Sequence, residues 1–375
     1  MKHRIAPSVL LGLLFFPAMQ SAIAQAPLDI ALGAPAGFIA SDIHAGGDGR
    51  YCISGSVVDD TGPSESAYVL LVDTTHRQVL WRASIPHGHN TVGNTATRCI
   101  GDGKAWYAVT EEHTNRAESL NQTKVIINKL SSQGVLLKQQ AINAGFDEWS
   151  YLLDANAGGV AVAGGTSATL ERGGSFGTWV ARFDTDLQPT QTVKLDNGAF
   201  WTDTRAQLDG NHLLLSGEFL PNKGPQAGGR DAYATAKIDL ASRKYAWANY
   251  ALPDNTRSAN AVFSTDGTTY MVGFTPNDLA VAKVDRTGKT LSAFTVKKPL
   301  CGADALTLSG STLKAIGTAC DGDAPAIASI DLASKAATAA RALGGDVSAS
   351  TFDGDVWVGI VKTKAHDQFF RRSAQ

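Results

Sequence analysis

Carboxylate, guanidinium and indole side chains gather in two short polar segments near the middle of the chain. Glu148 and Trp149 lie in the first segment, and Trp201, Asp203 and Arg205 lie in the second. A carboxylate pair such as Glu148 and Asp203 can do acid–base work if burial separates the two pKa values. Two tryptophans beside carboxylates and an arginine would also suit a sugar or peptide ligand. Glu148, Asp203 and Arg205 are therefore the candidate catalytic residues, and Trp149 and Trp201 are candidate ligand-binding residues.

Comparable polar segments supply four further candidates for ligand binding, which are His87, His89, Asp147 and Arg257. His87 and His89 alternate along an extended segment, so their rings face the same side. A metal site would need more ligands than these two, and no Cys/His spacing typical of zinc sites occurs. We expect no metal and no cofactor.

Acidic residues also recur at a fixed place in the pattern, which favours a structural explanation for some of the candidates. Asp147, Asp203, Asp304 and Asp346 each stand close to the start of a predicted strand. An aspartate at such a place often forms hydrogen bonds with its own turn or with the next structural unit. The sequence leaves both the structural and the ligand-binding interpretation open.

Four cysteines indicate disulfides if the protein works in an oxidising compartment. Cys301 and Cys320 lie at equal distances on either side of residues 309–312. If these residues turn a hairpin, the two sulfurs fall opposite each other across the strand pair. Cys52 and Cys99 would then pair by elimination, between neighbouring repeats, or remain as buried free thiols.

One pattern of turns and strands returns along the chain. A turn carrying Asp-Gly or a near equivalent recurs every 43 to 57 residues. Such turns require positive φ, which Gly, Asp and Asn tolerate best. The turn elements are Asp48-Gly49, Asp102-Gly103, Gly158-Gly159, Asp209-Gly210, Asp266-Gly267, Ser309-Gly310 and Asp353-Gly354.

Each turn is followed by an apolar strand that in six of seven cases ends in Gly, then by a polar loop and two further strands. Four strands per repeat and seven repeats predict an all-β, seven-bladed β-propeller. The seventh repeat lacks a fourth strand, whereas residues 28–32 form a spare strand before the first repeat. Because closure of the ring removes exposed edges, we expect residues 28–32 to complete the last blade. The Ala-rich stretch 333–342 is the best candidate for a helix.

The expected organisation is a signal peptide over residues 1–24 and one propeller domain over residues 25–375. The expected blades cover about 38–88, 89–144, 145–197, 198–254, 255–299, 300–344 and 345–375, the last together with 28–32.

The repeats resemble the degenerate propeller repeats of bacterial exported proteins, including quinoprotein-like ones. The segments Leu71-Val72-Asp73-Thr74-Thr75-His76-Arg77-Gln78-Val79-Leu80-Trp81 and Lys283-Val284-Asp285-Arg286-Thr287-Gly288-Lys289-Thr290-Leu291 carry this resemblance. The docking pattern Thr-Gly-Lys-x-x-Trp of true quinoprotein dehydrogenases is complete nowhere in the chain. The resemblance therefore implies the fold and transfers no activity.

The N-terminus has the layout of a secretory leader. Lys2 and Arg4 precede an apolar run of about a dozen residues, and Ala22-Ile23-Ala24 provides a cleavage site. The run is too short to span a bilayer. The formal charge of −2 becomes −4 without Lys2 and Arg4, and the basic residues are scattered. We therefore expect a periplasmic or secreted protein with no membrane span and no affinity for nucleic acid.

Loop length gives a further indication of function. The predicted loops between second and third strands are long in the first four repeats, at residues 58–66, 111–122, 167–177 and 220–231. Long loops on a rigid scaffold are frequent binding sites. We expect a non-enzymatic monomer that binds a protein, peptide or glycan over blades one to four. The alternative is a hydrolase or lyase acting on saccharides or peptides at the channel mouth.

Overall fold

The computed structural model describes residues 27–58, 65–88, 91–114, 122–167, 176–195, 199–221, 232–320, 324–338, 340–342, 345–363 and 366–374. At residues 199, 200, 202, 203, 220 and 221 the description covers the backbone alone. The expected signal peptide, residues 1–24, lies outside the described residues.

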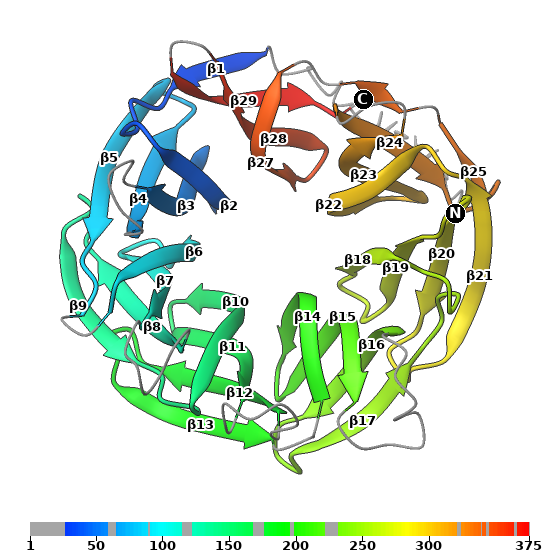
Figure 1. Ribbon diagram of the computed structural model, residues 1–375, viewed down its shortest axis with the longest axis horizontal. Helices are drawn as coiled ribbons and strands as arrows, with labels where there is room; N and C mark the ends of the chain where they lie inside the picture. The colour runs from blue at the N-terminus through cyan, green and yellow to red at the C-terminus, as the bar shows by residue number, and fades with distance from the viewer. Residues whose placement is uncertain are drawn as a thin grey trace, which may run out of the picture.

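Seven antiparallel sheets stand radially around a central channel, so the predicted seven-bladed propeller is confirmed (Figure 1). Blade 1 contains β2 (Phe38–Gly47), β3 (Arg50–Val58), β4 (Glu65–Asp73) and β5 (Gln78–Ile85). Blade 2 contains β6 (Gly93–Gly101), β7 (Trp106–His113), β8 (Thr123–Leu130) and β9 (Leu136–Ala141). Blade 3 contains β10 (Asp147–Asn156), β11 (Gly159–Ser167), β12 (Phe176–Phe183) and β13 (Pro189–Leu195).

The remaining four blades continue the ring in sequence order. Blade 4 contains β14 (Ala199–Asp209), β15 (His212–Pro221), β16 (Ala232–Asp239) and β17 (Lys244–Asn249). Blade 5 contains β18 (Ser258–Phe263), β19 (Thr269–Phe274), β20 (Asp278–Val284) and β21 (Thr290–Lys297). Blade 6 contains β22 (Leu300–Ser309), β23 (Thr312–Ala319), β24 (Pro325–Asp331) and the short strands β25 (Ala336–Ala337) and β26 (Arg341–Ala342). Blade 7 contains β27 (Asp346–Asp353), β28 (Val356–Lys362), β29 (Asp367–Ser373) and β1 (Leu28–Ala31).

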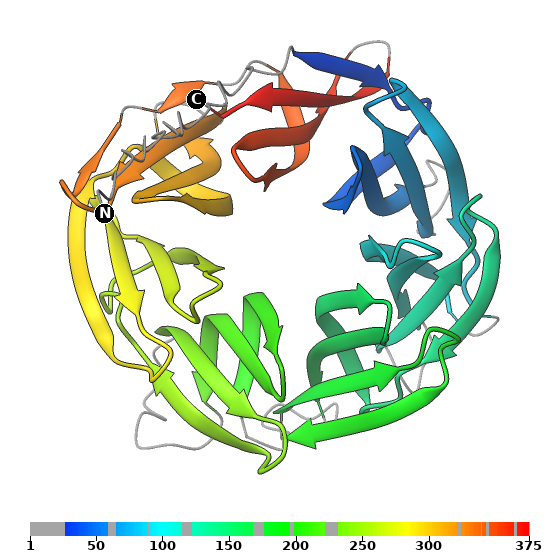
Figure 2. The ribbon, with the colours of Figure 1, turned by 180° about the vertical axis from the view of Figure 1, so that it is seen from behind.

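The ring closes as expected, because the N-terminal strand β1 pairs with β29 (Figure 2). Leu28 lies opposite Arg371, and Ile30 lies opposite Phe369. The guanidinium of Arg372 donates a hydrogen bond of 2.7 Å to the Leu28 carbonyl. Arg82 of β5 donates one of 2.8 Å to the Leu32 carbonyl, so blade 1 also holds the closing segment.

The hydrophobic core is divided among the gaps between blades. In the part of the chain that the structure describes, one apolar cluster fills each of the seven gaps between neighbouring blades. Central strands such as β11 and β19 are buried over their whole length, because each is covered on both faces. The outermost strand β17 alternates between exposed and half-buried residues. The innermost strand β27, which faces the channel, is also mostly half-buried. Burial is therefore greatest in the middle strands of a blade and lower at the channel and at the rim.

The recurring glycines have two physical roles. Those in the first turn of a blade adopt positive φ, for example 73° at Gly49 and 89° at Gly103. Those in the second strand, which continues for three residues beyond Gly55 and Gly164, allow close approach of the innermost strand. A Cβ at Gly55 would lie 2.1 Å from the carbonyl oxygen of Ile39, and one at Gly164 would lie 2.0 Å from that of Trp149. Any larger residue would push the innermost strand away.

Both expected disulfides are present. Cys301 and Cys320 join the two ends of the first hairpin of blade 6, and both are exposed. Cys52 and Cys99 join blade 1 to blade 2, and both are buried. Disulfides of this kind are compatible with an oxidising compartment. Among the described residues, no helix has the length and apolar character that crossing a membrane requires.

Candidate functional site

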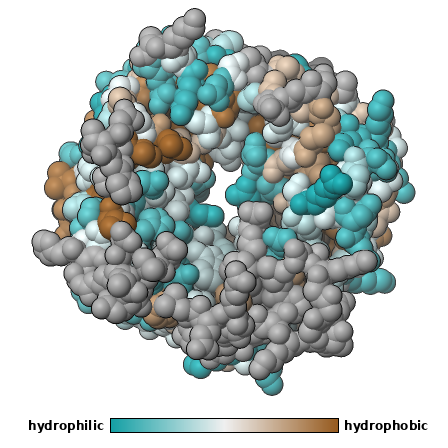
Figure 3. Space-filling model, viewed as in Figure 1, coloured by the Kyte–Doolittle hydropathy of each residue, from teal (hydrophilic) through white to brown (hydrophobic). Residues whose placement is uncertain are grey.

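A cavity of about 1710 Å³ occupies the mouth of the central channel and is lined by the innermost strands of all seven blades. Figure 3 shows the channel as an opening at the centre of the ring. The lining is mostly polar, with hydroxyl groups such as those of Ser41, Ser258 and Ser350. Because the strands of a propeller converge here, side chains from blades far apart in sequence can reach one ligand.

A bulge in six of the seven innermost strands decides which side chains enter the cavity. The register shifts lie between Ala40 and Asp42, Ala96 and Arg98, Ser150 and Leu152, Thr202 and Arg205, Ala303 and Ala305, and Val347 and Ala349. A bulge bends its strand and changes the direction in which the following side chain points. Asp42, Arg98 and Arg205 all follow a bulge directly, and all three line the cavity.

Aromatic residues form one wall of the cavity, over blades 3 and 4. We call Phe146, Trp149, Tyr151, Phe176 and Trp201 the aromatic wall. The indole nitrogen of Trp149 donates to the Tyr151 hydroxyl at 2.7 Å, and this hydroxyl donates to the Trp201 carbonyl at 2.8 Å. The Trp149 and Phe176 rings meet edge to face, with centroids 6.5 Å apart. The wall is therefore a fixed surface, of which Trp149, Phe146 and Phe176 remain half-buried rather than buried.

Acidic side chains occupy the opposite part of the cavity. Asp304, Asp346 and Asp42 come from blades 6, 7 and 1, and we call them the acidic arc. In the described part of the chain, no hydrogen bond or ion pair engages these three carboxylates. Burial raises the pKa of Asp304, and the charge of Arg205 opposes this shift. The Arg98 guanidinium, half-buried on blade 2, likewise has no such partner among the described groups.

Arg205 spans the inner end of blade 5. Its Nε donates to the Asn260 side chain at 3.2 Å, and its second terminal nitrogen donates to the Asp304 carbonyl. Asn260 in turn donates to the Ala303 carbonyl at 2.9 Å. These contacts connect blades 4, 5 and 6 through groups that line the cavity.

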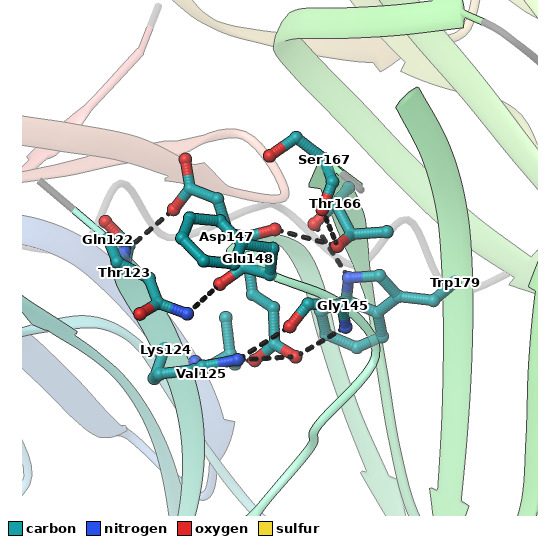
Figure 4. A network of polar contacts seen from close by, with 12 residues as sticks. Gln122, Thr123, Lys124, Val125, Gly145, Asp147, Glu148, Thr166, Ser167 and Trp179 are labelled. Carbon is teal, nitrogen blue, oxygen red and sulfur yellow. Dashed lines mark hydrogen bonds and ion pairs between the residues drawn. The ribbon is translucent and has the colours of Figure 1, made fainter. Parts of the chain in front are cut away.

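The carboxylate of Glu148, a sequence candidate for catalysis, joins two blades instead of facing the cavity (Figure 4). It is fully buried and accepts hydrogen bonds from the backbone N–H groups of Val125 at 3.1 Å and Gly145 at 3.0 Å. The Lys124 ammonium lies 3.9 Å away. A carboxylate held in this way has no free oxygen to offer a substrate, so its geometry favours a structural role.

Asn94 joins blades 1 and 2 by buried hydrogen bonds, as Glu148 joins blades 2 and 3. Its buried side chain accepts a hydrogen bond of 2.7 Å from the Ala67 N–H and donates one of 3.1 Å to the Ile85 carbonyl. Asp147, which lines the cavity, also accepts from the Thr123 N–H at 2.8 Å. The inter-blade hydrogen bonds expected for the recurring acidic residues therefore occur at Asp147.

The other candidates from the sequence fall in different places. Trp201 and Arg205 line the cavity. His87 is exposed, contacts Thr91 at 2.9 Å and lies outside the cavity lining, as does the exposed Arg257. His89 lies outside the described residues, and so does the side chain of Asp203.

Much of the four long loops, including residues 59–64, 115–121, 168–175 and 222–231, also lies outside the described residues. Among described groups, no cluster of His, Cys, Asp or Glu has the geometry of a metal site.

Sequence reasoning missed Arg98 and Asp42 as site residues. Arg98 and Arg205 each stand five residues before the glycine of their turn, Gly103 and Gly210. Counting back from the turn could have indicated both arginines, but only with the bulge position known.

Solved structures similar to this chain are propellers. The Dos1 propeller matches with a TM-score of 0.55 and 9% identity, covering 92% of this chain and 94% of that chain. Sqt1 of Saccharomyces cerevisiae matches at 0.51 and 12%, covering 94% and 85%. The propeller domain of the Trilobed protease from Pyrococcus furiosus, described as having an open velcro topology, matches at 0.50 and 9%, covering 90% and 95%. No protein-family model and no curated protein sequence matches the chain. At these identities the likeness shows the fold alone.

Proposed function

We propose that this protein is a binding protein that holds a polar ligand, a peptide or a glycan, at the mouth of its channel. The observation that carries this proposal is the cavity of about 1710 Å³ with an aromatic wall on one side and unengaged charged groups on the other. Ligand sites commonly combine apolar surface with a few polar groups that fix orientation. A propeller that needed only to be stable would gain nothing from unpaired charges at this position.

The cavity replaces the long loops as the centre of the proposed site. The expected ligand face over blades one to four overlaps the cavity at Trp149, Trp201 and Arg205. The other charged groups, Asp304 and Asp346, belong to blades 6 and 7. We therefore propose that the ligand spans the channel mouth.

We also propose that the protein is exported and works as a monomer. Export is supported by the leader-like N-terminus and by the two disulfides. The monomer is supported by the closure of the ring, since β1 and β29 of the same chain complete the last blade.

A cavity-filling variant tests binding directly. Ser348 is half-buried at the bulge of β27 and lines the cavity, whereas Ser132 is exposed in the turn between β8 and β9. A random peptide display library and a glycan array are applied to the wild type, Ser348→Trp and Ser132→Trp. We expect ligands that bind the wild type and Ser132→Trp equally and bind Ser348→Trp at least about tenfold more weakly, a loss of about 1.4 kcal/mol. Ligands that ignore the Ser348 change, or no ligand in either collection, would overturn the proposal.

The second candidate function is a hydrolase or lyase acting on saccharides or peptides, and one observation favours it. Asp304 faces the cavity beside Arg205, and burial raises the pKa of its carboxyl. An aspartic acid that keeps its proton to higher pH can donate it to a leaving oxygen. If a bound ligand is turned over, we expect Asp304→Asn to abolish turnover while binding persists. Turnover unaffected by this change would exclude Asp304 as the acid.

A further inference from the structure

The walls of the cavity are electrically unequal around the ring. The acidic arc, Asp304, Asp346 and Asp42, occupies three consecutive blades, 6, 7 and 1. Arg98 on blade 2 and Arg205 on blade 4 flank the aromatic wall, Arg205 reaching from there to the Asp304 carbonyl. Asp147 beside the wall is engaged by the Thr123 N–H. A ligand that fits this cavity must therefore differ in charge from one end to the other.

No described hydrogen bond or ion pair engages the carboxylates of the acidic arc, and the charge of Arg205 compensates Asp304 only in part. Arg205, which approaches the arc, donates hydrogen bonds to the Asn260 side chain and to the Asp304 backbone carbonyl. Asp42 is half-buried, whereas Asp304 and Asp346 are exposed, and the arc does not form a group that could hold a metal ion. Carboxylates that line one concave site together attract a cation more strongly than a single carboxylate on an open surface does.

This lining discriminates between classes of ligand. A neutral glycan could stack on the aromatic wall but would leave the acidic arc and Arg98 without counter-charges. An acidic glycan would satisfy Arg98 and be repelled by Asp304, Asp346 and Asp42. A small polyamine would satisfy the acidic arc but would place like charge near Arg98 and leave the aromatic wall unused. A peptide can carry a cationic side chain, an aromatic side chain and a carboxylate on one chain.

We infer that the ligand of this cavity is a peptide segment whose lysine or arginine side chain binds the acidic arc and whose aromatic side chain packs on the aromatic wall. This inference rests on the proposed binding function and names its ligand class. The half-buried Trp149 and Phe176 provide the apolar contact, because large aromatic surfaces supply most of the affinity in such sites. Arg98 then faces the carboxylate or the backbone carbonyls of the same peptide.

The test begins with selection from a display library of random peptides about twelve residues long, with a glycan array in parallel. We expect the selected peptides to be enriched in lysine or arginine together with aromatic residues. Affinities of the selected synthetic peptides are then measured for the wild type and for the triple variant Asp42→Asn, Asp304→Asn and Asp346→Asn. The triple variant should bind about tenfold more weakly, because three partly solvated charge pairs are lost.

Asp48→Asn is the matched control. Asp48 is exposed in the turn between β2 and β3, outside the cavity lining, and its positive φ of 51° suits asparagine. Its affinity for the selected peptides should stay within about twofold of the wild type. A salt series on the wild type gives a second measurement that needs no variant to fold. Affinity should fall several-fold between about 0.05 and 0.5 M salt, because the pairs are screened.

The possible failures separate the two proposals. Selected peptides without cationic residues, or peptides that bind the triple variant and the wild type equally, would overturn the inference and leave the binding function standing. Glycans that bind at the cavity while no peptide does would have the same consequence. Absence of any ligand in both collections would overturn the inference and the binding function together.

Discussion

The two halves of the ring hold their blades together by different means. Blades 1, 2 and 3 are joined away from the cavity by the buried side chains of Asn94 and Glu148 and by the disulfide between Cys52 and Cys99. Blades 2 and 3 are also joined at the cavity, through Asp147 and Ser150. Blades 4, 5 and 6 are joined at the channel itself, through Arg205 and Asn260. A ligand in the cavity would therefore contact the joint of blades 4, 5 and 6 and leave Asn94, Glu148 and the disulfide between blades 1 and 2 untouched.

The difference arises at one repeated position of the innermost strand. Asn94 in blade 2 and Glu148 in blade 3 lie opposite Glu112 and Thr166, two places beyond the point where the second strand approaches the innermost one. In blades 4, 6, 7 and 1 this position carries Trp201, Leu300, Val347 and Phe38. A polar group at this position must form inter-blade hydrogen bonds to be buried at low cost, whereas an apolar one needs only to pack. The comparison indicates that stability can change without a change in binding at the buried joints of Asn94 and Glu148, whereas stability and binding are coupled at Arg205 and Asn260.

The largest expected effect comes from cutting the covalent joint of the first half. Replacing Cys52 and Cys99 by alanine opens a link between residues 47 apart in sequence, so the free energy of unfolding should fall by about 4 kcal/mol. Removing Cys301 and Cys320, only 19 residues apart, should cost about 3 kcal/mol. Urea unfolding of both double variants measures the difference. A larger loss for the second pair would contradict the idea that the first half depends more on its joint.

Loss of the Glu148 carboxylate should have the next largest effect. Glu148→Ala leaves the buried N–H groups of Val125 and Gly145 without their acceptor, which should lower the free energy of unfolding by about 3 kcal/mol. Glu148→Gln keeps one carbonyl oxygen and should lose less. Both losses are measured by urea unfolding, and the affinity of folded protein for the selected peptides should stay unchanged. A weakened affinity in a fully folded Glu148 variant would break the proposed separation of stability from binding.

Asn260→Ala, in the second half of the ring, should lower stability only slightly and should change peptide affinity. The change removes the bonds to Arg205 and to the Ala303 carbonyl and should lower the free energy of unfolding by only about 1 kcal/mol. Because it removes one of the groups that hold Arg205 in place at the cavity, it should also alter peptide affinity, which is measured by the same titration. Asn255→Ala, at an exposed position in the loop before β18, is the control and should change neither quantity. Unaltered affinity would mean that the second half is not coupled to the site.

Much of the fold could be predicted from the sequence because its determinants are local. Turn glycines mark positive φ, and the spare strand at residues 28–31 pairs with β29 as expected. The Ala-rich stretch 333–342 was the best candidate for a helix, and that prediction was wrong. Its described residues form the short strands β25 and β26 against β24, since pairing with the rest of the blade outweighs the helix propensity of alanine.

The site could be predicted less well because it depends on bulges in six of the seven innermost strands. Side chains alternate between faces with a period of two, so one inserted residue exchanges the faces. Glu148 precedes the bulge of β10 and joins blades, whereas Arg98 follows the bulge of β6 and enters the cavity. Nothing in the local sequence marks where a bulge falls. Residue types alone therefore favoured Glu148 and passed over Arg98 and Asp42.

The smallest expected effect concerns the ionisation of Asp304. It tests whether the acidic arc carries an uncompensated negative charge. Burial raises the pKa of Asp304, with Arg205 opposing, so the folded protein binds this proton more tightly than the unfolded chain does. The free energy of unfolding must then decrease as pH rises from about 3.9, the ordinary pKa, to the raised pKa of Asp304. Above the raised pKa this loss of stability stays constant. Asp304→Asn cannot ionise, so its Tm should equal that of the wild type near pH 3 and exceed it slightly at pH 7. Thermal unfolding at both values measures this, with Asp48→Asn as control. If the Tm of the wild type rises relative to that of the variant as pH rises, Arg205 compensates the Asp304 carboxylate fully. The acidic arc would then have little charge left for a cationic peptide.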